Sequence, residues 1–343
     1  SGGFYRTVSF GGASRTSVQG EEDAFVAKYD PTGNYIWDVT FGSFFPDVIN
    51  DLAVDSSNNI FVTGFYQATI TIQGTSVSSW GTGIDVLFAK FNSSGTLQFI
   101  KNFYNAGTEY GNGIVIDSGD NVYISGYFNG YINFSGGQVD SNLLSLGGAY
   151  IAKFDNSGTW IWSKKYGNES ESTRFWAMAL DASENLLIAG DFKNATNIGG
   201  GTITSASYTE DGYIAKYSSV NGAWMANLHL RGFQNSDFRP RCISRDVSDN
   251  ILLVGYIKRY LDCGNSVVLE PTQSEQRGFA AKFSSALVAQ WAYSFTGPSL
   301  SELLGCAFTS LSPLVSGFYS GNETFAGKNL SGNQRAALIL MTP

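Results

Sequence analysis

Short apolar runs recur along the whole chain, separated by polar turns rich in Asp, Asn, Ser and Gly. The runs favour Val, Ile, Tyr, Phe and Trp, which is typical of β-strands joined by tight hairpin turns. Ile60–Gly64 and Tyr150–Phe154 are two examples. The sequence shows no stretch with the periodicity and capping residues of an α-helix. The pattern therefore predicts an all-β protein.

The strand pattern is an internal repeat of about 63 residues. Three markers keep one register along the chain: an Ala-Lys pair in an apolar run, a glycine after a small or β-branched run, and a large aromatic residue after each Ala-Lys pair. The pairs are Ala27-Lys28, Ala89-Lys90, Ala152-Lys153, Ala215-Lys216 and Ala281-Lys282, the glycines are Gly64, Gly126, Gly190, Gly255 and Gly317, and the aromatic residues are Trp37, Phe99, Trp162, Trp224 and Trp291.

Each repeat unit reads as four antiparallel strands, which is typical of a blade of a β-propeller. We expect one domain over 1–343 with about six four-stranded blades. Five blades with leftover strands and an open β-solenoid are the alternatives. The repeat units fall at approximately 1–63, 64–125, 126–189, 190–254, 255–316 and 317–343, the last being partial. We expect Val54, Ile116 and Leu180 on innermost strands and Trp37, Trp162, Trp224 and Trp291 packed between sheets.

The strands do not divide evenly among the blades. Ser1–Phe4 matches the second-strand segment Thr63–Tyr66, and the last run, Ala336–Met341, reads as a third strand. This predicts six second and six third strands but five first and five fourth strands. An incomplete sheet exposes backbone groups that can pair with another chain. The residues expected at such an assembly seam are Phe4, Tyr5, Val8, Ala337, Leu338, Ile339 and Leu340.

The unit that runs from Asp23-Ala-Phe-Val-Ala-Lys-Tyr-Asp-Pro-Thr-Gly to Leu52-Ala-Val-Asp-Ser-Ser-Asn-Asn-Ile-Phe-Val-Thr-Gly resembles the bacterial β-propeller repeat often called SBBP. It is more distantly similar to NHL repeats. The resemblance covers nearly the whole chain and fades in the last two units, where Leu340-Met341 replaces Ala-Lys and the Asp of the first turn is replaced near Thr309. It implies a propeller fold and an extracellular or cell-surface location, and it implies almost nothing about chemistry.

Charge and cysteine content exclude several classes of function. The net charge of -8 disfavours nucleic acid as a partner, because phosphate binding needs clustered Lys and Arg. No apolar stretch approaches the length of a transmembrane helix, so membrane insertion is not expected. The cysteines are Cys242, Cys263 and Cys306, and their spacing fits no metal site. They allow at most one disulfide, whose pairing stays open at this point.

The candidate chemistry is sparse, and no catalytic residue, metal or cofactor is expected. His229 is the single histidine and has no motif around it. The repeated Lys and Asp residues recur in nearly every unit, whereas a catalytic group is needed once. Their expected role is to satisfy buried groups or to pair with each other. The turns after Asp55 and Asp117 read as Asx turns, and Ca²⁺ binding there is the weaker alternative.

Differences between the units mark the expected binding surface, because variable loops on a rigid scaffold are the usual place for binding sites. The candidate residues in these loops are Phe44, Phe45, Trp80, Tyr110, Arg174, Phe238 and Arg239. We expect a non-enzymatic structural or interaction module that binds protein, including copies of itself. A carbohydrate-binding lectin that uses the loop face is the alternative. An enzyme that acts on polysaccharide through a carboxylate pair is the weakest reading.

Overall fold

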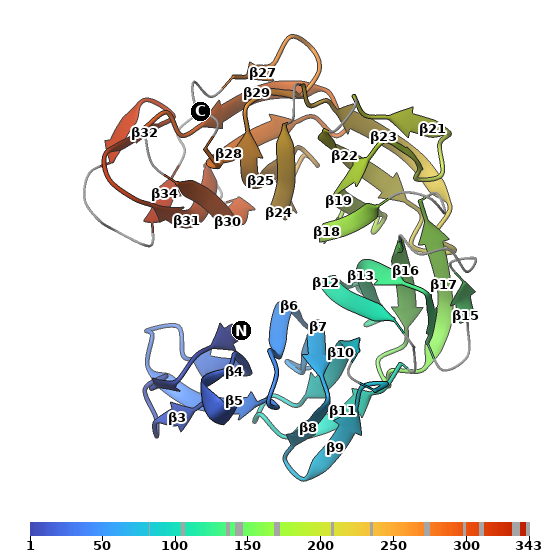
Figure 1. The fold of residues 1–343 in the computed structure, drawn as a ribbon, viewed down its shortest axis with the longest axis vertical. Helices are drawn as coiled ribbons and strands as arrows, with labels where there is room; N and C mark the ends of the chain where they lie inside the picture. Colours follow the sequence, from blue (N-terminus) through green and yellow to red (C-terminus); the bar gives the residue numbers. More distant parts are fainter. Residues whose placement is uncertain are drawn as a thin grey trace. The chain divides into compact units, whose positions relative to one another are not determined.

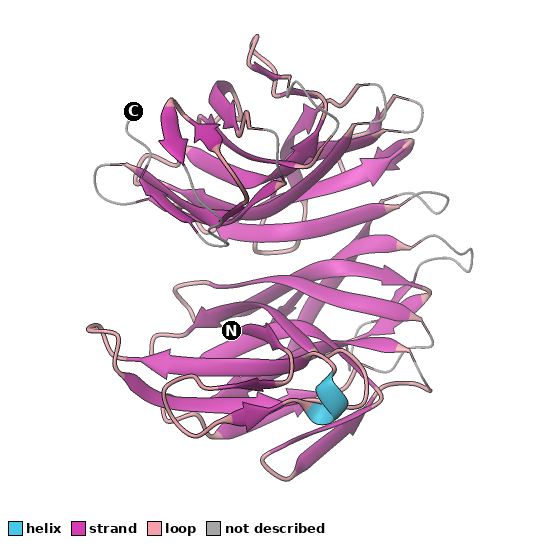
Figure 2. Ribbon diagram, turned by 60° about the vertical axis from the view of Figure 1, so that its left-hand side comes forward, coloured by secondary structure: helices cyan, strands magenta, loops and turns pink. Residues whose placement is uncertain are grey.

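The computed structural model describes residues 1–81, 83–103, 107–134, 138–140, 147–167, 172–206, 209–233, 236–270, 275–297, 300–308, 312–330 and 337–340. The chain divides into two compact units, Ser1–Lys165 (unit 1) and Tyr166–Pro343 (unit 2). β-strands dominate both units, and the helix drawn in Figure 2 is the short 3-10 turn η1 (Val18–Gly20). Within the described ranges, no helix is long and apolar enough to cross a membrane.

The large strands of unit 1 form three antiparallel groups, called sheets one to three here, in which strands that follow one another in sequence lie side by side (Figure 1). A single parallel pairing, Ile84 with Thr108, joins sheets two and three at one end. Sheet one is β1 (Gly2–Phe4), β4 (Asp23–Tyr29) and β5 (Tyr35–Phe41). Sheet two is β6 (Val48–Val54), β7 (Ile60–Gln67), β10 (Ile84–Phe91) and β11 (Leu97–Lys101). Sheet three is β12 (Thr108–Ile116), β13 (Val122–Asn129), β16 (Gly148–Phe154) and β17 (Trp160–Tyr166).

Unit 2 contains three further sheets of the same kind (Figure 1). Sheet four is β18 (Thr173–Leu180), β19 (Leu186–Lys193), β22 (Glu210–Tyr217) and β23 (Trp224–Leu230). Sheet five is β24 (Asp237–Arg245), β25 (Ile251–Lys258), β28 (Arg277–Phe283) and β29 (Ala289–Ser294). Sheet six is β30 (Ser301–Phe308), β31 (Pro313–Tyr319) and β34 (Ala337–Leu340).

A small hairpin lies between the second and third strands of every sheet. The hairpins are β2 (Thr7–Val8) with β3 (Arg15–Thr16), β8 (Thr69–Ile72) with β9 (Thr75–Ser78), β14 (Tyr131–Asn133) with β15 (Gln138–Asp140), β20 (Ala195–Asn197) with β21 (Thr202–Thr204), β26 (Leu261–Asp262) with β27 (Val268–Leu269), and β32 (Glu323–Phe325) with β33 (Lys328–Leu330). The connections between second and third strands therefore contain short strands of their own.

The six sheets have the strand order of propeller blades, so the predicted all-β β-propeller fold is confirmed. The count over the described residues is six second, six third, five first and five fourth strands, as the repeat register predicts. Val54, Ile116 and Leu180 lie on the first strands β6, β12 and β18, as expected. That residues 1–343 form one domain stays a prediction.

Aromatic side chains fill the space between neighbouring sheets within each unit. Phe88 is fully buried, and its ring centroid lies 4.8 Å from that of Phe154 in sheet three. The fourth-strand tryptophans are less buried than the sequence predicts. Trp224 is 39% exposed, and Trp37, Trp162 and Trp291 are only half-buried, because the outermost strand of a blade has fewer neighbours to cover it. The deep core is formed instead by side chains of the two central strands.

The repeated Lys and Asp residues are paired within single sheets, as predicted. Lys90 Nζ lies 3.6 Å from Asp55 Oδ2, and Lys153 Nζ lies 3.7 Å from Asp117 Oδ2. Lys216 pairs with Asp181, and Lys282 pairs with Asp246 at 3.6 Å. Each of these Asp residues also closes an Asx turn: Asp55 Oδ1, for example, accepts hydrogen bonds from the amides of Ser57 and Asn59. These carboxylates therefore stabilise the fold through the ion pairs and the Asx turns.

Candidate functional site

The first strand of five sheets carries a β-bulge, and the extra residue is Asn in both sheets of unit 1 but differs from sheet to sheet in unit 2. A bulge re-aims one side chain and is often found next to a functional site. The bulged residues are Asn50 and Asn112 in unit 1 and Trp176, Arg241 and Leu304 in unit 2. The bulge recurs in these sheets, whereas the side chain at the bulged position is not constant. A position that the repeat does not constrain can carry a binding residue.

In unit 1 the bulged residues are uncharged and contact each other. Asn50 Nδ2 donates hydrogen bonds to the carbonyl oxygen of Gly111, at 2.9 Å, and to Asn112 Oδ1, at 3.3 Å. Beside them the Tyr110 ring lies between two others, with centroids 4.9 Å from Phe65 and 4.7 Å from Tyr127. The sequence placed Tyr110 in a variable loop, whereas the structure places it on β12 in an aromatic stack.

In unit 2 two of the bulged residues, Trp176 and Arg241, belong to a cation–aromatic cluster, defined here as Arg174, Trp176, Arg239, Arg241 and Tyr256. The Arg239 guanidinium carbon lies 4.6 Å from the Trp176 ring centroid and 5.7 Å from that of Tyr256. Arg174 lies 5.5 Å from the Trp176 ring, and Arg241 lies 5.8 Å from the Tyr256 ring. All of these distances fall within the range of cation–π contacts.

Two of the three arginines in the cluster are neutralised by carboxylates. Arg174 donates to Asp191 Oδ1 at 2.7 Å and to Glu210 Oε1 at 3.0 Å. Arg241 Nε donates to Glu302 Oε1 at 2.5 Å. Arg239, in contrast, makes no ion pair with a carboxylate of the described residues, and its buried Nε has no hydrogen-bond acceptor there. Arg239 is the uncompensated cation of the cluster.

The carboxylates around Arg174 hold the cluster in one charge state. Burial acts to raise the pKa of Glu210, but its hydrogen bond to Asp237 and the charge of Arg174 lower it to about 2. Burial acts to lower the pKa of Arg174, and the Asp191 carboxylate raises it overall. Trp176 Nε1 donates to Asp191 Oδ2 at 2.9 Å, which fixes the indole next to Arg239. The surface is therefore preorganised at neutral pH.

This arrangement suits a ligand with both a carboxylate and a flat or apolar group. A planar guanidinium binds a carboxylate through two parallel hydrogen bonds, and stacking on aromatic rings restricts its motion. Within the part of the chain that the structure describes, no group of three or more His, Cys, Asp or Glu side chains is placed to hold a metal ion. The cluster is built for binding through charge and stacking.

The structure brings together only two of the candidate binding residues. Arg174 and Arg239 belong to the cation–aromatic cluster. Phe44, Phe45 and Trp80 lie in loops of unit 1 and are 63%, 39% and 61% exposed. No contact between these three and Tyr110 is seen among the described residues.

Phe238 is not part of the candidate binding surface. It is 1% exposed, and its ring centroid lies 5.4 Å from that of Phe279 in the core of unit 2. Successive residues of a strand point to opposite faces, so Phe238 turns inward where Arg239 turns outward on β24. Gly212 leaves room for the Phe238 ring against β22.

The predicted seam residues occupy several different environments. Phe4 lies on β1 but is only 7% exposed, and its ring makes edge contacts with those of Phe10 and Phe25. Tyr5 is 58% exposed, and Val8 belongs to the β2–β3 hairpin instead of sheet one. Ala337, Leu338, Ile339 and Leu340 form β34, which pairs with β31 as the predicted third strand.

The histidine and the cysteines have structural partners. His229 Nε2 lies 2.7 Å from Asp211 Oδ2, and Asp211 also accepts a hydrogen bond from the Gly232 amide. Cys242 on β24 forms a disulfide with Cys306 on β30, and Cys263 is a buried free thiol. This resolves the pairing that the sequence left open.

Trp176, Arg241 and Tyr256 were missed by reasoning from loop lengths, because all three lie within strands. A signal was nevertheless present in the aligned repeats. Five residues before the turn Asp, successive units carry Asn50, Asn112, Trp176 and Arg241, which differ in size and charge. Variation at one position of an otherwise regular strand marks the bulge.

Comparison with known proteins gives a distant relative. No family model matches the chain. A segment of 176 residues, 46% of the chain, is 27% identical to a protein of Acanthamoeba polyphaga mimivirus described as "Uncharacterized WD repeat-containing protein L264". The match spans 12% of the length of that protein. Together with the six blade-like sheets, this similarity indicates a repeat protein of the β-propeller class.

Proposed function

We propose that this protein is a non-enzymatic interaction module that binds an acidic segment of a partner protein through the cation–aromatic cluster of unit 2. The observation that carries the proposal is Arg239, whose guanidinium is held between Trp176 and Tyr256 without a carboxylate partner among the described residues. An Asp or Glu side chain from a partner supplies the missing charge. Arg, Trp and Tyr are also the residues most often dominant at protein interfaces.

The chemistry of the cluster favours an acidic peptide over a neutral sugar. Sugar binding needs an open aromatic face together with polar groups for the hydroxyls. In the cluster, the Trp176 ring is already in contact with two guanidinium groups, and the Tyr256 ring with two as well. The charge that is left unpaired is cationic, so the complementary ligand is an anion.

We further propose that the protein acts outside the cytoplasm. Structural disulfides persist in oxidising compartments, and the Cys242–Cys306 bond joins two sheets of unit 2. The resemblance of the repeat to bacterial surface propellers supports the same location.

Fluorescence anisotropy with a peptide array tests the binding proposal. The array contains fluorescein-labelled peptides that combine Asp or Glu with an aromatic residue, together with the same peptides carrying Asn or Gln instead. We expect the acidic members to bind and the amide members to bind at least about tenfold more weakly, which corresponds to a charge-assisted pair. Binding of the acidic members should weaken as salt is raised.

Arg239→Met is the decisive variant, since it keeps an apolar stem but removes the guanidinium. Arg231→Met is the matched control, because Arg231 is an exposed arginine of the same unit outside the cluster. We expect Arg239→Met alone to abolish discrimination between acidic and amide peptides. Equal binding by both variants, or selective binding of neutral oligosaccharides in a parallel array, would overturn the proposal.

A further inference from the structure

Three exposed aromatic side chains lie in two loops at one end of sheet two. Phe44 and Phe45 belong to the loop between β5 and β6, and Trp80 belongs to the loop between β9 and β10. They are 63%, 39% and 61% exposed and are called the aromatic patch here. Large apolar side chains that gather at one place on a protein surface mark an interaction site.

The loop that carries Phe44 and Phe45 is held by a buried carboxylate. Asp47 is fully buried and accepts hydrogen bonds from the amide of Ser43, at 2.5 Å, and from the amide of Gln67, at 2.8 Å. Ser43 Oγ donates to the carbonyl oxygen of Gln67, at 2.7 Å, and accepts from the amide of Phe45, at 3.1 Å. These bonds fix the backbone of the loop, so its two phenyl rings are presented to solvent in a defined conformation.

The loop that carries Trp80 is anchored at the next residue of the chain, Ala68. The Ser79 amide donates to the carbonyl oxygen of Ala68, at 2.8 Å, and the Ala68 amide donates to Ser79 Oγ, at 2.9 Å. The Gly83 amide donates to the carbonyl oxygen of Trp80, at 3.0 Å, which closes the turn. Consecutive Cα atoms are about 3.8 Å apart, so the anchors of the two loops at Gln67 and Ala68 are adjacent.

Carboxylates flank the aromatic patch. The carbonyl oxygen of Glu22 accepts a hydrogen bond from the Asp47 amide, at 2.7 Å, which places Glu22 beside the Phe44 loop. Glu22 Oε2 accepts a hydrogen bond from the Tyr5 hydroxyl, at 2.9 Å, but neither Glu21 nor Glu22 forms an ion pair with a described Lys or Arg. Unit 1 also holds most of the net negative charge of the chain. A cationic side chain therefore complements this surface.

We infer that the aromatic patch is a docking site for a segment of a partner protein in which an arginine stands between apolar residues. The apolar residues cover the rings of the patch, and the guanidinium pairs with the Glu22 carboxylate. A planar guanidinium can also stack on an exposed ring such as that of Trp80. A lipid surface is a poorer occupant, because anionic headgroups repel the flanking carboxylates. This site is independent of the Arg239 proposal, which concerns unit 2 and a ligand of opposite charge.

The probe is a set of fluorescein-labelled peptides with one Arg between Leu or Val residues and with Gly-Ser flanks. The matched peptides carry Gln or Glu in place of the Arg. Anisotropy with the whole protein measures the dissociation constants. We expect saturable binding of the Arg peptides, binding about tenfold weaker for the Gln peptides, and no saturable binding of the Glu peptides. Added salt should weaken the Arg peptides more than the Gln peptides.

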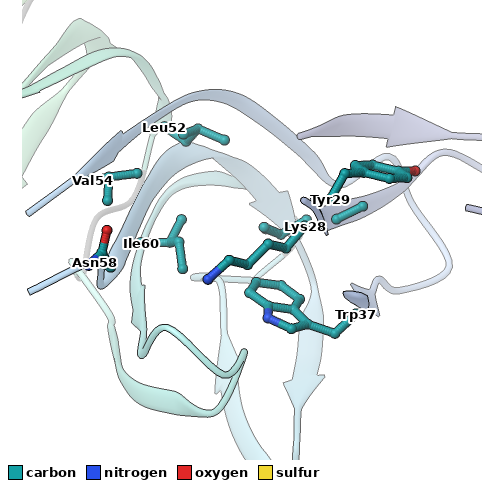
Figure 3. A pocket seen from close by; sticks show the side chains of 9 residues that line it. Lys28, Tyr29, Trp37, Leu52, Val54, Asn58 and Ile60 are labelled. Atoms are coloured by element: carbon teal, nitrogen blue, oxygen red, sulfur yellow. The ribbon is translucent and has the colours of Figure 1, made fainter. Parts of the chain in front are cut away.

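Substitution of exposed residues tests the surface without disturbing the core, and far-UV circular dichroism checks the fold of each variant. Phe44→Ala and Trp80→Ala should each weaken the Arg peptides on the order of tenfold or more, as expected for aromatic anchors of an interface. Tyr29→Ala is the aromatic control and should leave binding unchanged. Tyr29 is 45% exposed and lines a cavity of about 330 Å³ at the far end of β4 from Glu22 (Figure 3).

Glu22→Gln tests the charge separately from the apolar contact. It should remove most of the preference for Arg peptides over Gln peptides. Asp30→Asn, which removes an exposed carboxylate outside the patch, should keep that preference. Arg239→Met should also keep it, so failure at this site and failure at the cluster of unit 2 are distinguishable.

Absence of saturable binding by every Arg peptide, or equal weakening by Trp80→Ala and Tyr29→Ala, would overturn the inference. Co-sedimentation of the protein with phosphatidylcholine vesicles that is lost in Trp80→Ala would also overturn it, since a lipid surface would then cover the patch. A concentration-dependent dimer in light scattering that Trp80→Ala dissociates would assign the patch to a second copy of the chain instead.

Discussion

Lys90 Nζ lies 3.6 Å from the Asp55 carboxylate and 4.7 Å from the centre of the Phe61 ring, so one lysine joins the turn and the core of sheet two. The Lys90 side chain is 10% exposed and that of Asp55 is 1% exposed. Burial acts to raise the pKa of Asp55, but hydrogen bonds from Asn156 and Asn59 outweigh it and lower the pKa to about 2. The carboxylate is thus charged at neutral pH and needs its cation.

Replacement of Lys90 by Met should therefore destabilise the protein by about 3 kcal/mol, because it leaves a buried carboxylate without its countercharge. Lys28→Met is the matched control, since Lys28 occupies the same repeat position without a carboxylate partner among the described residues. We expect less than about 1 kcal/mol for the control. Urea unfolding followed by far-UV circular dichroism measures both, and equal losses would contradict the pairing argument.

Aromatic residues of the central strands should contribute more to the free energy of unfolding than aromatic residues of the outer strands. Phe88→Ala removes a fully buried ring between sheets two and three and should cost about 4 kcal/mol. Trp224→Ala removes a ring that is 39% exposed on an outer strand, so about 1 kcal/mol is expected. The same urea experiment ranks the two variants. A larger loss for Trp224→Ala would mean that the outer strands carry more of the core than the structure shows.

Unit 1 should be more stable at pH 5 than at pH 7.5. Burial raises the pKa of Asp47 and of Asp85 to about 6. The pKa of an unfolded Asp is about 3.9. The folded state therefore binds more protons than the unfolded state between these values, and stability falls as pH rises through about 6.

Asp85→Asn should reduce this dependence on pH, because the amide cannot ionise. Asp30→Asn is the control, since hydrogen bonds from Asn34 and Thr32 lower the pKa of that exposed carboxyl to about 2, outside the range tested. The measurement is the urea midpoint at pH 5 and at pH 7.5. A midpoint that rises with pH in the wild type would contradict the sign of the argument.

The disulfide should stabilise unit 2 by roughly 4 kcal/mol, because Cys242 and Cys306 are 64 residues apart and the bond restricts the unfolded chain. The Cys242→Ala, Cys306→Ala double variant should lower the urea midpoint, and reductant should then have no further effect. In the wild type, reductant should reproduce most of the loss. An unchanged midpoint after complete reduction, checked by thiol titration, would count against the prediction.

The sequence alone determined the repeat, the four-stranded unit and the uneven strand count, because those features follow from local preferences that recur in register. Short runs rich in β-branched and aromatic residues specify strands, and Asx turns such as the one after Asp55 specify where strands reverse. The pairing of Lys90 with Asp55 could also be anticipated, since both residues recur together in four units.

Only the tertiary structure decided which side chains face outward together. A bulge shifts the alternation by one residue, so the pattern before Trp176 and Arg241 gives no warning that they point to a common surface. The same alternation places Phe238 in the core and Arg239 against the Trp176 ring, although the two are neighbours in sequence. The Cys242–Cys306 pairing likewise depends on which sheets lie side by side, and the packing of distant segments is not set by local propensity.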